Sequence, residues 1–281
     1  MSSLSEPMCV APTADTRVGT IQTTRKQRAK IAKEIGGTNA PWNEVVWTYL
    51  LAHVLATSPR QHLRLLCGED VTPRDPFDAW FEAQPMPPRG GLRGFSEKNS
   101  KIDLAFGDIA RRGSAEGSGI AYAKRPGSWA CFVEAKFLSD CSSTVSHDPL
   151  RNQLTRVIES LLCFQDADGC FPERLYFTLL TPRHLQKVEN RGARLYGYKM
   201  AEYADPAALL RDIQSCKIPV RNEPRWRYPD LVQRLSSLKL NWVAYEDVFD
   251  NEPGLAGLDL VAIAKSGQIP PAVAEIGRAH V

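Results

Sequence analysis

Residues 128–140 read SWACFVEAKFLSD, an apolar run that carries a carboxylate and an ammonium two positions apart. Because successive side chains of a strand point to opposite faces, the apolar residues at odd positions would share one face. These residues are Trp129, Cys131, Val133, Ala135 and Phe137. Glu134 and Lys136 fall on the other face. The run therefore predicts a strand with one core face and one face that holds a charge pair.

The composition is that of a soluble globular chain. Its 281 residues are 43% hydrophobic and 24% charged, which is enough for one large domain with a sizeable core. The net charge is only +3, but cations gather in two segments, one near the N-terminus and one later in the chain. They are Arg17, Arg25, Lys26, Arg28, Lys30 and Lys33, and then Arg221, Arg225, Arg227 and Arg234. This distribution permits a polyanionic partner without requiring one.

The expected location is the cytoplasm. The seven cysteines show no paired CxxC spacing, so neither a disulfide framework nor a zinc site is indicated, and the five histidines show no metal-ligand spacing. The N-terminus lacks the pattern of a signal peptide, and no stretch approaches the roughly 20 apolar residues of a membrane span. We expect a protein that is neither secreted nor bound to a membrane.

Three regions are expected along the chain. Residues 1–38 form a basic, partly disordered N-terminal extension, in which residues 23–37 read as a short helix ending at Gly36 and Gly37. Residues 39–274 form the main domain. Residues 275–281, EIGRAHV, look like the translation of a sequencing-adapter read-through, so they are not expected to belong to the natural protein.

Helices and strands alternate through the main domain. An amphipathic helix with Glu44 in its first turn is expected over 39–57, and another helix over 148–164. The expected strands are KIDLAFGDIA at 101–110, a short run at 120–124, the run at 128–140, RLYFTLLTP at 174–182 and a segment opening 240–250. This order predicts an α/β fold with a central mixed β-sheet flanked by helices.

Polar side chains would converge if the strand at 101–110 pairs with the strand at 128–140. Asp103 points away from the apolar stripe of its strand, as Glu134 and Lys136 do from theirs. Two carboxylates a few ångströms apart repel, so each has a raised pKa unless a cation lies between them. Oxygen ligands with open positions suit Mg²⁺ or Mn²⁺.

These residues resemble the PD-(D/E)xK nuclease superfamily, whose core is restriction-endonuclease-like. KIDLAFG stands in the place of the first acidic motif and FVEAKF in the place of (D/E)xK, while HDPLRNQLTR looks like the helix that follows. The resemblance extends from about Asn43 to Asp250, with a glutamate on the first helix. Ile102, rather than proline, precedes the aspartate, which is a departure from the motif.

The resemblance implies a metal-dependent endonuclease that hydrolyses phosphodiester bonds of DNA, in a restriction or defence system. Asp103, Glu134 and the backbone carbonyl of Ala135 would hold Mg²⁺ or Mn²⁺. Lys136 would orient or help to deprotonate the attacking water and stabilise transition-state charge. Two further catalytic residues are implied at positions 44 and 153.

Glu44 would bind a second metal or a water, and Gln153 would contact a metal-bound water or the lysine. Each has a plainer explanation, because a glutamate favours any helix N-terminus and an amide on a helix surface needs no special reason. Asp108 is an alternative to Asp103 as metal ligand. Arg151 and Asn152 are either solvated or phosphate-contacting.

A structural ion pair at a sheet edge is the competing explanation of the charge pair. At the level of function, the alternative is a catalytically inactive or repurposed nuclease-fold module that binds nucleic acid or a protein partner. Trp226 is either a packing residue or a surface on which a base stacks. A homodimer and a partner methyltransferase are compatible with the sequence, although no residue indicates either.

Overall fold

The computed structural model describes residues 19–90, 101–114, 117–141, 151–191 and 194–279. The disorder expected for the first residues therefore lies outside the described residues, as does the end of the expected adapter-derived segment. None of the helices in these ranges combines the length and the apolar character that crossing a membrane requires.

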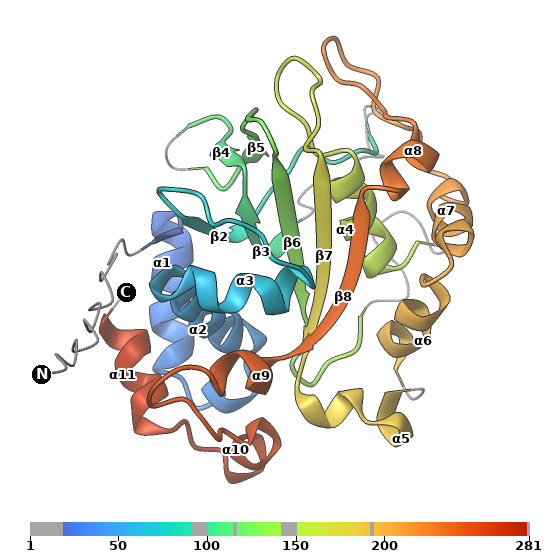
Figure 1. The fold of residues 1–281 in the computed structure, drawn as a ribbon. Coiled ribbons are helices and arrows are strands. Elements are labelled where there is room, and N and C mark those ends of the chain that lie inside the picture. Colours follow the sequence, from blue (N-terminus) through green and yellow to red (C-terminus); the bar gives the residue numbers. More distant parts are fainter. Residues whose placement is uncertain (1–18, 91–100, 115–116, 142–150, 192–193, 280–281) are drawn as a thin grey trace, which may run out of the picture.

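A six-stranded mixed sheet forms the centre of the molecule (Figure 1), which confirms the predicted α/β class. Its strands run in the order β1, β2, β3, β6, β7, β8. They are β1 (Thr20–Gln22), β2 (Asp78–Ala83), β3 (Ile102–Gly107), β6 (Trp129–Ala135), β7 (Arg174–Thr181) and β8 (Leu238–Ala244). β3 is antiparallel to both β2 and β6, whereas β6, β7 and β8 are mutually parallel. A second small sheet pairs β4 (Ile109–Arg111) with β5 (Ile120–Tyr122).

Helices cover both faces of the large sheet. One face packs against α2 (Glu44–Thr57) and α3 (Pro59–Cys67), and the other packs against α4 (Gln153–Leu162) and α7 (Pro206–Gln214). The remaining helical elements are α1 (Arg25–Ile35), η1 (Ala40–Trp42), η2 (Arg183–Gln186), α5 (Val188–Arg191), α6 (Leu195–Glu202), α8 (Leu231–Leu235), α9 (Tyr245–Phe249), α10 (Leu260–Ser266) and α11 (Pro271–Ala279). The result is a three-layer arrangement, in which a strand inside the sheet is buried on both faces.

The helix predicted over 39–57 is present as α2, but it is not amphipathic. Ten of its fourteen residues are buried. One side of α2 packs on the sheet, and α1 and α11 cover much of the rest. Asn43 caps this helix, because its side-chain oxygen accepts a hydrogen bond from Val45 N at 3.0 Å. The cap fixes the start of α2, and therefore the position of Glu44.

The predicted basic helix is present as α1, and Gly36 is its C-cap. Thr24 and Gln27 form a capping box at its start. The Gln27 amide also donates to the backbone carbonyls of Phe81 and Glu82 on β2, at 3.0 and 3.1 Å. Together with the pairing of β1 to β2, these contacts make the second half of the expected extension part of the folded body.

Candidate active site

The two strands expected to carry the site are neighbours in the sheet. Leu104 pairs with Val133, which places Asp103 and Glu134 one position further along on adjacent strands. The Ala135 backbone N–H donates to the Asp103 carboxylate at 2.8 Å. The convergence that the sequence predicts is therefore present at the end of β6.

Lys136 is the first residue after β6, and its ammonium group connects the elements around it. Its Nζ lies 2.9 Å from a carboxylate oxygen of Glu134 and donates to the Ala135 carbonyl at 2.7 Å. A third contact, at 3.2 Å, reaches the Glu44 carboxylate. The ammonium group thus holds the end of β6 against the first turn of α2.

Glu44 begins α2 and binds the segment that follows β6. Besides contacting Lys136, its carboxylate accepts hydrogen bonds from Phe137 N and Ser139 Oγ, each at 3.1 Å. The Glu44 side chain is 29% exposed, against 6% for the side chain of Lys136. Solvent therefore reaches the cluster at Glu44 but scarcely at Lys136. Its contacts reach well beyond its own helix, so a favourable position near the helix dipole does not fully account for this residue.

Gln153 begins α4 on the opposite side of the sheet from α2. Its amide nitrogen donates to the same Glu134 oxygen that contacts Lys136. The five side chains expected at the site therefore lie close together, although they come from β3, the end of β6, α2 and α4. The Ala135 carbonyl, expected as a metal ligand, accepts from the Lys136 ammonium in this structure.

The burial of the charge pair differs from the prediction. Glu134 is fully buried and Lys136 is only 5% exposed, although the sequence predicts an outward-facing pair. The reason is that α4 packs on this face of β6 and closes it. Burying charges is costly unless they are paired and hydrogen-bonded, so the arrangement must offset a substantial desolvation penalty.

The electrostatics of the cluster favour additional positive charge. Burial raises the pKa of the Asp103 carboxyl well above its usual value, and the neighbouring Glu134 charge raises it further. Burial likewise raises the pKa of Glu134, although Lys136 opposes the shift. The pKa of Lys136 is raised despite burial, because Glu134, Asp103 and Glu44 all favour its charged form. One ammonium thus faces three carboxylates.

The residues present fit a divalent cation. The second carboxylate oxygen of Glu134 is buried and has no hydrogen-bond partner among the described residues, and Asp103 lies beside it. A cation between these carboxylates would favour their charged forms and so oppose the rise in both pKa values. Within the described ranges, no group of three His, Cys, Asp or Glu side chains is arranged to hold a metal. The donor set is therefore two carboxylates of hard oxygen type, which suits Mg²⁺ or Mn²⁺.

No family model, curated protein or solved structure matches this chain.

Asp108, the alternative to Asp103, lies at the other end of β3. It is 2% exposed, and its carboxylate accepts from Arg74 at 2.6 Å and from Trp129 N at 2.9 Å. These bonds tie the turn after β3 to the start of β6. Asp108 is therefore part of the framework, far along the strand from Glu134.

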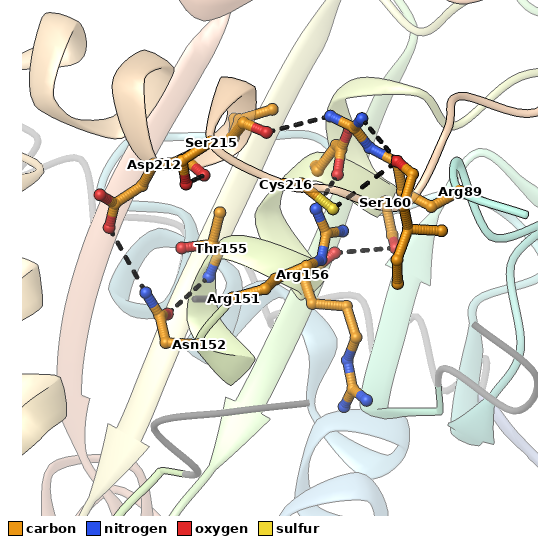
Figure 2. A network of polar contacts seen from close by, with 12 residues as sticks. Arg89, Arg151, Asn152, Thr155, Arg156, Ser160, Asp212, Ser215 and Cys216 are labelled. Atoms are coloured by element: carbon orange, nitrogen blue, oxygen red, sulfur yellow. Dashed lines mark hydrogen bonds and ion pairs between the residues drawn. The ribbon is translucent and has the colours of Figure 1, made fainter. Parts of the chain in front are cut away.

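Arg151 and Asn152 belong to buried networks that support α4 (Figure 2). Arg151 is fully buried and forms an ion pair with Glu159. Asn152 is the N-cap of α4, with its side-chain oxygen accepting from Thr155 N at 2.9 Å. Both residues fix the start of α4, and neither is solvated as one interpretation of the sequence suggests.

Two residues near the site have no role in the sequence-based account. Ser139 contacts Glu44, and Arg156 lies close enough to Glu134 to lower its pKa. Arg156 follows Gln153 by three positions, the spacing that places two residues on one face of a helix. That spacing was the feature of the sequence that could have identified Arg156.

Trp226 packs beside Tyr228, with ring centroids 6.1 Å apart.

Proposed function

We propose that this chain is a metal-dependent endonuclease of the PD-(D/E)xK type that hydrolyses phosphodiester bonds of DNA. The observation that carries the proposal is the meeting of Asp103, Glu134 and Lys136, where one buried oxygen of Glu134 has no hydrogen-bond partner among the described residues. The element order α2, β2, β3, β6, α4, β7 supports it, because it supplies a glutamate helix, the two motif strands and a glutamine helix in the implied sequence.

Asp103 and Glu134 would hold Mg²⁺ or Mn²⁺. When bound, the metal would supply a water of lowered pKa and neutralise phosphate charge. Gln153 fixes the orientation of the Glu134 carboxylate, because its amide donates to one oxygen and leaves the other available.

Lys136 acts as a cation in this proposal. Its raised pKa keeps the side chain protonated at neutral pH, which favours donation to a developing oxyanion over removal of a proton from water. Glu44 holds the ammonium group from the solvent side. Exposed cations on α1 would add contacts to the DNA backbone without sequence preference. A cytoplasmic restriction or defence role, a homodimer and a partner methyltransferase remain proposals of the same kind.

The alternative is a nuclease-fold module that binds nucleic acid or a protein partner without catalysis. The burial of Glu134 and Lys136 favours it, because a closed ion pair also serves as a structural element. An intact set of three catalytic-type residues favours the nuclease.

The experiment that separates them is plasmid cleavage by the wild type and by Lys136→Ala, with DNA affinity measured separately in Ca²⁺. Loss of one electrostatic contact to the transition state costs on the order of 10²–10³ in rate, so the variant should bind DNA but barely cut it. Asp103→Ala and Glu134→Ala should lose metal, so excess Mn²⁺ should restore part of their activity but none to the lysine variant. Equal cleavage by wild type and Lys136→Ala would refute the mechanism.

A further inference from the structure

The guanidinium group of Arg156 makes no hydrogen bond or ion pair within the part of the chain that the structure describes. Arg156 is the fourth residue of α4, and its backbone carbonyl accepts from Ser160 Oγ at 2.9 Å. Its side chain points away from Arg89 and Arg151 in Figure 2, and no dashed line ends on its guanidinium group. Its Nε–H is buried and lacks a hydrogen-bond partner in the part of the chain that the structure describes. A buried donor left unpaired is costly, so its position calls for a partner.

The surroundings of this guanidinium group identify the site to which it belongs. Burial raises the pKa of Glu134 and the charge of Arg156 opposes that rise, so the guanidinium group lies within electrostatic reach of the candidate active site. Gln153, one helical turn earlier, already contacts Glu134. The unpaired donor of Arg156 and the unpartnered Glu134 oxygen therefore occur in one neighbourhood.

The helix itself disfavours a cation at this position. Arg156 lies in the first turn of α4, where the positive end of the helix dipole repels positive charge. The Lys136 ammonium group, a second cation, already contacts Glu134. An additional anion at this point would satisfy both the dipole and the unpaired donor.

We propose that Arg156 binds a non-bridging oxygen of the phosphate that occupies the Asp103 and Glu134 site. This inference rests on the proposed nuclease function and adds a substrate-binding residue to it. A guanidinium group presents planar donors that match two phosphate oxygens, and it stays charged over the whole pH range of the enzyme. Arg156 thereby positions the phosphodiester, while Lys136 keeps its proposed role at the developing oxyanion.

The first test compares DNA affinity in Ca²⁺ for wild type, Arg156→Gln and Arg156→Lys. A charge-assisted hydrogen bond corresponds to about a 10- to 100-fold difference in affinity, so the glutamine variant should bind that much more weakly. The lysine variant keeps the charge without the fork and should lie between the two. Arg211→Gln is the matched control, because Arg211 is exposed on a different helix, α7, and this substitution removes the same charge.

The second test distinguishes phosphate binding from a structural role. A methylphosphonate is placed at the position that the wild type cleaves, so that this one phosphate carries no charge. Arg156→Gln should then bind the modified duplex about as well as the wild type does. An equal loss on both duplexes, or no loss on the unmodified one, overturns the assignment of Arg156.

Failure of the proposed function gives a different result. If the wild type shows no metal-dependent cleavage of any DNA, the nuclease proposal fails and the role of Arg156 fails with it. If the wild type cleaves while Arg156→Gln binds and cleaves equally well, only the assignment of Arg156 is wrong.

Discussion

Asp103→Asn should make the metal-free protein more stable while it removes the proposed activity. The amide retains an oxygen that can accept from Ala135 N, which bonds to Asp103 at 2.8 Å in the wild type. The substitution also removes the charge of a carboxyl group whose pKa is raised by burial and by the charge of Glu134. Neutralising a catalytic residue that is held in an unfavourable charged state raises the free energy of unfolding. Neutralising a residue that serves stability lowers it.

The magnitude follows from the link between pKa and folding. Each pKa unit of difference between the folded and unfolded states corresponds to about 1.4 kcal/mol, so removing a carboxylate whose pKa is raised in the folded state should stabilise that state by an amount of this order. We expect a gain of about 1–3 kcal/mol in the free energy of unfolding at neutral pH. For a chain of this size, that is roughly 2–4 °C in Tm for each kcal/mol.

Asp108→Asn is the control, because it makes the same change just beyond the other end of β3. The Asp108 carboxylate has favourable partners in Arg74 and Trp129 N. Removing its charge leaves a half-buried arginine without an ionic partner, which should cost about 1–3 kcal/mol. The two substitutions should therefore shift stability in opposite directions.

The assay is urea unfolding in EDTA at several pH values. The unfolded chain ionises Asp103 near pH 3.8, whereas the folded chain ionises it only at a higher pH. The wild type therefore loses stability as pH rises through this window, and the advantage of Asp103→Asn should grow over the window and then stay constant. A destabilised Asp103→Asn at neutral pH, or a gain that shrinks as pH rises, would refute the reasoning.

Three further outcomes are expected. Glu44→Ala should lower the free energy of unfolding by about 1–2 kcal/mol in urea titrations, because two hydrogen-bond donors and Lys136 lose a partner, and it should slow single-turnover cleavage. Excess Mg²⁺ at about 100 times its Kd should stabilise the wild type by about 2.7 kcal/mol in thermal unfolding, but should leave Glu134→Gln nearly unchanged. A third variant neutralises three exposed cations of α1, namely Arg25, Lys26 and Lys33. The slope of log K for DNA binding against log salt should then fall by up to about 0.9 for each lost phosphate contact. An unchanged slope would exclude α1 from the DNA interface.

Local pattern was sufficient to find the strands that carry the candidate site. The alternation in KIDLAFG and in the run at 128–140 identified β3 and β6, and their pairing brought Asp103 to Glu134 as predicted. Alternation tells which side chains share a face, but not what covers that face. The burial of Glu134 and Lys136 depends on α4, which packs there through contacts distant in sequence.

β2 and β1 were not predicted, for a related reason. β1 has three residues and exists as a strand only because it pairs with β2. β2 contains Glu82 with a φ of 45°, a backbone conformation that departs from a regular strand pattern. The burial of α2 on nearly all sides likewise depends on α1 and α11, whose packing no local window reveals.

Conversion of supercoiled plasmid by wild type and Asp103→Asn, each in Mg²⁺ and in EDTA, is the most direct measurement of the central claim. The wild type should nick or linearise the plasmid in Mg²⁺ and leave it intact in EDTA. Asp103→Asn should leave it intact in both, although it is folded and more stable than the wild type. If the wild type leaves diverse plasmids intact in Mg²⁺ and in Mn²⁺, or if Asp103→Asn cuts at the wild-type rate, the site formed by Asp103, Glu134 and Lys136 is not a nuclease centre.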